Sequence, residues 1–137
     1  MKSLIVSAVL PAVLLAGMGA AVAQQETARP DPPVLKQVTG EFPKADQLEA
    51  RVMTATVQPG TVSPWHTHTA PVTVYVLEGT FTLEVENRDP ITVKAGQALL
   101  EPINVKMRAA NRDPAQATKV VIFQVSKPED PFLHPAH

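Results

Sequence analysis

The stretch PGTVSPWHTHTAPVTVYVLEG, from Pro59 to Gly79, decides the fold of this chain. It opens with a Pro-Gly turn, places His66 and His68 two residues apart, and continues into a strongly β-prone run. Side chains i and i+2 of a strand point to the same face, so an extended His-Thr-His places two imidazoles side by side. The stretch therefore predicts a turn, a pair of neighbouring histidines and a strand.

Strand-like segments continue on both sides of this stretch. Residues 80–86 alternate polar and apolar, which directs Phe81, Leu83 and Val85 toward a core. The other expected strands are residues 48–57, 72–77, 91–93, 98–100, 105–110 and 118–125. Seven or eight short strands with regular turn signals, and no helical period of useful length, predict an all-β antiparallel sandwich or barrel.

The N-terminal residues have the pattern of a secretory signal. Lys2 precedes an apolar run from Leu4 to Ala16, and Ala21-Val22-Ala23 has the A-x-A form of a cleavage site. Pro11 and the small residues that follow the run argue against a transmembrane helix. We expect residues 1–23 to be a signal peptide and the mature protein to be periplasmic or secreted, with no membrane attachment after cleavage.

The remaining chain divides into three parts by composition. Residues 24–47 form a Pro-rich N-terminal arm, in which Val34 to Val38 has the composition of a short strand. Residues 48–126 are expected to form the barrel. Residues 127–137 are a proline-rich tail, whose His134 and His137 are expected to be exposed.

Composition excludes several functions. The chain has 12 basic and 13 acidic residues with no basic cluster, and it has one Trp and one Tyr, so no nucleic-acid partner is expected. No glycine-rich loop opens a helix, which argues against a nucleotide cofactor. There is no cysteine, so packing alone must hold the fold together.

The motif spacing resembles that of the cupins, a family of small double-sheet β-barrels. Two cupin motifs match in register, the first at Gly60, His66, His68 and Gly79 and the second at Gly96, Pro102 and Asn111. The resemblance implies a jelly-roll barrel of the RmlC-like type, which is an antiparallel double-stranded β-helix.

The chain departs from the cupin pattern at two metal-ligand positions. Cupins usually hold one divalent metal with three histidines and a glutamate, but Val72 stands at the glutamate position and Met107 at the last histidine position. Some bacterial cupins similar to this chain have Pro-Val in the first motif and Glu-Pro in the second, as in Glu101-Pro102 here. Glu101 is thus a candidate metal ligand or general acid or base, although its simplest interpretation is a solvated residue at the rim.

His66 and His68 are either metal ligands or a residual pair in a barrel that has lost its metal. Two imidazoles suit Zn, Cu, Fe or Ni, and Mn is a further candidate. Glu101, Met107 or His134 would complete the ligand set. Met107 either fills a gap in the core or supplies a soft sulfur ligand that favours copper.

The sequence and the resemblance predict a periplasmic single-domain cupin that binds a divalent metal weakly, either as an enzyme that acts on a small organic substrate or as a metal binder. The alternative is a metal-free barrel with an accessory or ligand-binding role, in which Trp65, Val72, Tyr75 and Met107 line an apolar pocket for a small molecule. A third hypothesis is a homodimer that assembles through the N-terminal arm.

Overall fold

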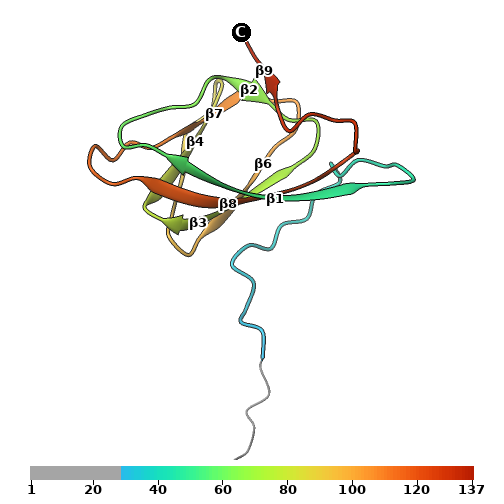
Figure 1. The fold of residues 1–137 in the computed structure, drawn as a ribbon, viewed down its shortest axis with the longest axis horizontal. Coiled ribbons are helices and arrows are strands. Elements are labelled where there is room, and N and C mark those ends of the chain that lie inside the picture. Colours follow the sequence, from blue (N-terminus) through green and yellow to red (C-terminus); the bar gives the residue numbers. More distant parts are fainter. Residues whose placement is uncertain (1–28) are drawn as a thin grey trace, which may run out of the picture. The chain divides into compact units, whose positions relative to one another are not determined.

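The computed structural model describes residues 29–137. The expected signal peptide, residues 1–23, and the start of the arm lie outside these described residues. Residues 32–137 form one compact unit, in which two antiparallel sheets lie one above the other (Figure 1). The predicted all-β jelly-roll architecture is confirmed.

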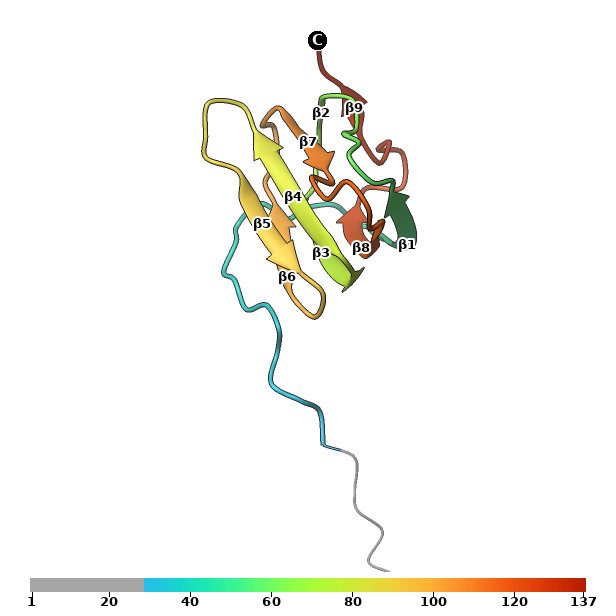
Figure 2. The same cartoon turned by 90° about the vertical axis from the view of Figure 1, so that its left-hand side faces the viewer.

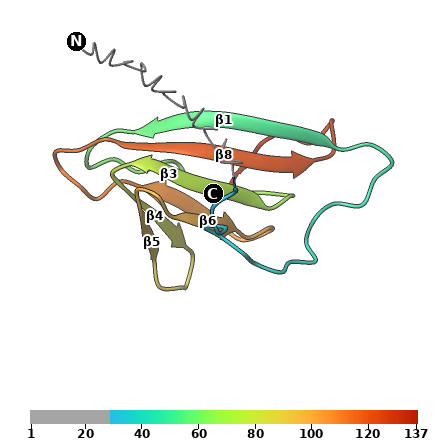
Figure 3. The ribbon, with the colours of Figure 1, turned by 90° about the horizontal axis from the view of Figure 1, so that it is seen from below.

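Nine strands within residues 29–137 make up the two sheets. Sheet A contains, in spatial order, β1 (Glu49–Val57), β8 (Thr118–Ser126), β3 (Val72–Glu78) and β6 (Ala98–Glu101), which are seen from below in Figure 3. Sheet B contains β5 (Ile91–Lys94), β4 (Thr80–Val85), β7 (Met107–Ala110), β2 (His66–Thr67) and β9 (His134–Pro135), as Figure 2 shows from the side. Seven of the nine were predicted to within two residues at each end. No helix occurs in residues 29–137, so none of these residues forms a helical membrane span.

The core lies between the inner faces of the two sheets. Phe81, Leu83 and Val85 point inward from β4, as their alternation predicted, and meet the inward valines of β3. The turn from β3 to β4 requires glycine, because Gly79 has a φ of 78° and an added Cβ would lie 2.8 Å from the carbonyl oxygen of Ala117. This turn fixes the register of β3, which follows the histidines.

The turn between β7 and β8 is held by two side chains. The Asn111 amide donates hydrogen bonds to the carbonyls of Val57 (3.1 Å) and Gln116 (2.8 Å). The backbone N–H groups of Ala115 and Gln116 donate to the Asp113 carboxylate and hold its pKa below the ordinary value of 3.8.

The terminal segments differ from expectation. The arm forms no strand at Val34 to Val38; it is rich in proline, which cannot donate to a ladder. The tail folds back on the barrel, where Thr67 of β2 pairs with His134 of β9. His134 is consequently half-buried rather than exposed, while His137 is exposed as expected.

Candidate metal centre

His66 begins the strand β2 and His68 directly follows it, and both side chains are buried on the inner side of sheet B. His66 is 8% exposed and His68 is 1% exposed. Their ring centroids are 4.9 Å apart and the rings meet edge to face. The predicted side-by-side placement of the two imidazoles is confirmed.

Backbone carbonyls fix the orientation of both rings. His66 Nδ1 lies 3.0 Å from the Pro64 carbonyl oxygen, and His68 Nδ1 lies 2.7 Å from that of Phe132. A carbonyl oxygen only accepts, so each Nδ1 carries the proton and donates it. In the neutral imidazole this leaves each Nε2 with a free lone pair, which is the arrangement of a histidine that binds a metal through Nε2.

Glu101, the last residue of β6, lies beside His68. Its Oε2 is 3.1 Å from His68 Nε2, and the residue is 5% exposed. The expectation of a solvated rim residue was wrong because Glu101 pairs in register with Val72 of β3, which directs its side chain into the barrel.

The His68–Glu101 contact has the distance of an ion pair without the geometry of a hydrogen bond. Within the described residues, the buried Nε2 of His68 has no hydrogen-bond partner. A hydrogen bond requires a suitable orientation as well as a short distance, so this contact is not a hydrogen bond. Burial of a polar group without a partner costs about 1–3 kcal/mol of folding free energy. A bound ligand at His68 Nε2 would remove this cost.

Three side chains bring their donor atoms together in the barrel interior. His66, His68 and Glu101 each offer one donor atom, and these atoms lie within 4.8 Å of one another. Metal-to-ligand distances of about 2.0–2.2 Å bring donors of one shell within about 4.4 Å of each other. Two imidazoles and one carboxylate suit a transition metal in chemistry, and a small closing movement of these side chains would bring all three donors within the spacing of one shell.

Two other predicted residues border the cluster of His66, His68 and Glu101. Met107 pairs in register with His66 across β7 and β2, and it is fully buried in the hydrophobic core. Val72 is also buried there, between Glu101 on one neighbouring strand and Gln124 on the other. Both residues give the cluster an apolar surround.

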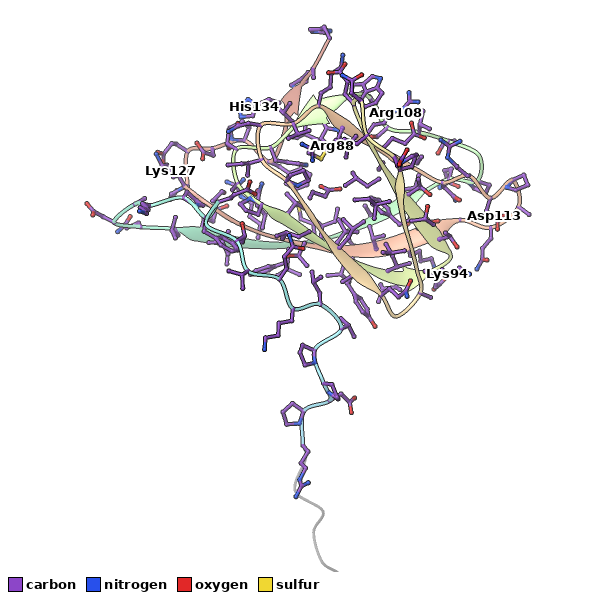
Figure 4. The ribbon with its side chains drawn as sticks, turned by 180° about the vertical axis from the view of Figure 1, so that it is seen from behind. Arg88, Lys94, Arg108, Asp113, Lys127 and His134 are labelled. Carbon is purple, nitrogen blue, oxygen red and sulfur yellow. The ribbon has the colours of Figure 1, made fainter. Side chains whose placement is uncertain are left out.

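The structure does not bring the remaining predicted residues to the cluster. Trp65 packs against the Arg108 guanidinium, 4.6 Å from the ring centroid. His134 is opposite Thr67 in register, whose side chain points away from the two histidines; Figure 4 labels Arg108 and His134. Tyr75 lies on the outer face of sheet A, where it lines a groove of about 430 Å³ with the arm.

Three residues near the cluster were not predicted. Gln124 is completely buried on β8, and Arg51 of β1 pairs with it in register. Phe132, in the tail, provides the carbonyl that accepts from His68. The period-two alternation of residues 118–125 places Gln124 on the inward face and was the available signal for it, whereas nothing local marks Phe132.

The comparisons with known proteins agree with this architecture. The model of the cupin domain matches residues 53–123, a segment that contains the two histidines and Glu101. No curated protein sequence matches the chain.

Two of the solved structures that resemble this chain are a cupin family protein and an enzyme. One is an RmlC-like cupin family protein with a double-stranded β-helix fold from Methanocaldococcus jannaschii. It has 22% identity and a TM-score of 0.53, with 58% of this chain and 72% of that protein covered. The other is the DMSP lyase DddQ from Ruegeria pomeroyi, with 20% identity, a TM-score of 0.51, and 64% and 42% covered. At these identities the likeness concerns the fold, and the cupin domain match extends over more than half of the sequence. The chain belongs to the cupin family.

Proposed function

We propose that this cupin binds one divalent transition metal ion through His66, His68 and Glu101. The observation that carries the proposal is the buried lone pair of His68 Nε2, which has no hydrogen-bond partner in the described residues and faces a buried carboxylate. A two-histidine, one-carboxylate set is typical of catalytic zinc and of non-haem iron(II). Zinc and iron are therefore the first candidates, followed by copper, nickel and manganese.

Three protein ligands would leave positions for water or a small organic substrate, and they favour weaker binding than the four ligands of the full cupin set. A bound metal would supply Lewis-acid polarisation of an oxygen atom or activation of water. The chain itself orients both imidazole rings through their Nδ1 atoms, places the Glu101 carboxyl group beside His68, and surrounds the three side chains with the apolar Val72 and Met107. The signal-like N-terminus supports a periplasmic or secreted location for this activity.

Elemental analysis of the protein purified from the periplasm tests the proposal. We expect metal at up to one ion per chain, lost in the double variant His66→Ala/His68→Ala and strongly reduced in Glu101→Gln. His134→Ala is the matched control, because it removes a half-buried histidine outside the cluster. Metal content that the double variant leaves unchanged would rule the site out.

A second candidate function is the binding of a small apolar molecule outside the barrel. The groove between the arm and sheet A has a size within the usual range of ligand sites, about 300–1,000 Å³, and it is lined by Tyr75, Phe42 and Leu100 among others. An apolar fluorescent probe should bind the wild type and lose affinity in Tyr75→Ala. Equal binding to both proteins would exclude the groove.

A further inference from the structure

The main-chain carbonyl of Phe132 accepts two hydrogen bonds from the interior of the barrel. One comes from His68 Nδ1 at 2.7 Å and the other from Gln124 Nε2 at 3.3 Å. The Phe132 ring also packs against the His68 ring, with centroids 5.1 Å apart. The tail, drawn in dark red in Figure 1, thus contacts His68 through Phe132, and Pro135 of β9 pairs in register with His66.

The Gln124 amide has one orientation that suits its neighbours. Its Oε1 lies 3.4 Å from Nη1 of Arg51, and a guanidinium only donates. Its Nε2 faces the carbonyl of Phe132, which only accepts. A flipped amide would bring two donors together at Arg51 and two acceptors together at Phe132. The donors therefore point in one direction, from Arg51 to Gln124 and from Gln124 to the tail.

Gln124 also lies in register with one of the proposed metal ligands. It is 0% exposed on the inner face of sheet A. Val72 is its partner on β3, and Glu101 is the partner of Val72 on β6. Burial of an amide is unfavourable unless its hydrogen bonds are made, and an apolar residue would fill this space without needing partners. What the Gln124 amide provides, and an apolar side chain would not, is the hydrogen bond to the Phe132 carbonyl.

We propose that Gln124 is a positioning residue of the metal site. By donating to the Phe132 carbonyl it holds that carbonyl against His68, which selects the Nδ1–H tautomer and leaves Nε2 free for the metal. The inference rests on the proposed function for its metal, but the tautomer itself is a property of the metal-free protein. It also makes the C-terminal tail a part of the site.

Long-range ¹H–¹⁵N NMR of the histidine side chains in the metal-free protein tests this directly. We expect His68 to be the Nδ1–H tautomer in the wild type and to show a mixture of tautomers in Gln124→Met. Metal affinity should fall about tenfold or more in this variant, as for other residues that orient a ligand from behind. Asn111→Leu is the matched control, since it too removes a buried amide; that amide donates to two carbonyls at the β7–β8 turn, away from His68. It should leave His68 unchanged.

An unchanged His68 spectrum in Gln124→Met would overturn the inference. If Gln124→Met does not fold, Arg51→Met replaces it, because losing Arg51 releases the Gln124 amide from its fixed orientation. We then expect a smaller shift of His68 toward a mixture of tautomers. No shift in Arg51→Met would again contradict the inference. A wild type with the Nδ1–H tautomer that shifts in the variants, yet binds no metal, would support the positioning role of Gln124 and refute the proposed function. The two failures are therefore distinguishable.

Discussion

His68 is the most constrained side chain of the site. Its Nδ1 proton is committed to a backbone carbonyl, its ring packs against Phe132, and its Nε2 faces Glu101. In a metal-free residual pair, a buried imidazole would be expected to use both nitrogens for hydrogen bonds with the protein. His134 Nε2 is likewise buried without a partner in residues 29–137, so the feature that distinguishes His68 Nε2 is the carboxylate beside it, and a cation held between the two accounts for that placement.

Variants of Met107 distinguish between a packing role and a metal-ligand role for this side chain. It is 0% exposed within the hydrophobic core, which favours packing. If it only packs, Met107→Leu should cost less than about 1.5 kcal/mol of unfolding free energy, whereas Met107→Ala should cost about 2–5 kcal/mol. Copper and zinc titrations should give the same affinities in Met107→Leu as in the wild type. A selective loss of copper affinity in the leucine variant would instead assign the sulfur to the metal.

At the scale of the strands, the carboxylate of the site lies one strand away from the position at which cupins usually place it. The usual position is occupied by Val72 on β3, and Glu101 is directly opposite it on β6. Side chains opposite each other in an antiparallel pair have Cβ atoms about 4.5–5.5 Å apart. A glutamate is long enough to reach one common point from either strand.

Exchanging the two side chains tests this account of the sheet. The double variant Val72→Glu/Glu101→Val returns the carboxylate to β3, and we expect its metal affinity to be within about tenfold of the wild type, the size of effect typical of adjustments around a metal ligand. The single variant Glu101→Val should bind far more weakly. Calorimetric titration of the three proteins makes the comparison, and a double variant no better than the single one would show that the strand position is essential.

The sequence predicted what depends on local spacing. Counting along the two motifs located His66 and His68 and identified the substitutions at Val72 and Met107. It did not predict that Glu101 is buried, because the pairing of β6 with β3 joins residues far apart in the chain. The pairing of β2 with β9 is equally non-local, so His134 was expected to be exposed, with a place in the ligand set as the alternative.

For the whole molecule, the outer face of sheet A is the surface that we propose as a homodimer contact. Val52 and Phe123 are cross-strand partners on β1 and β8, and they are 69% and 40% exposed. A sheet face that carries exposed apolar side chains can pack against its own copy about a two-fold axis. The arm lies over β3 and β6 of the same sheet.

Light scattering shows whether the homodimer forms through the outer face of sheet A or through the N-terminal arm. We expect a mass of two chains for the wild type and of one chain for Val52→Lys, because a charge would replace a buried apolar contact. Val38→Lys is the matched control, an exposed valine of the arm. Dimers lost in Val38→Lys and kept in Val52→Lys would move the contact to the arm, and a monomeric wild type would refute the homodimer.

The central claim is that one metal ion lies between His66, His68 and Glu101. Anomalous X-ray diffraction from crystals of the protein equilibrated with zinc or iron(II) tests it most directly. We predict a single strong anomalous peak within bonding distance, about 2.0–2.2 Å, of both Nε2 atoms and of the Glu101 carboxylate. Crystals that show no peak at this point, or a peak held by other side chains, would contradict the claim.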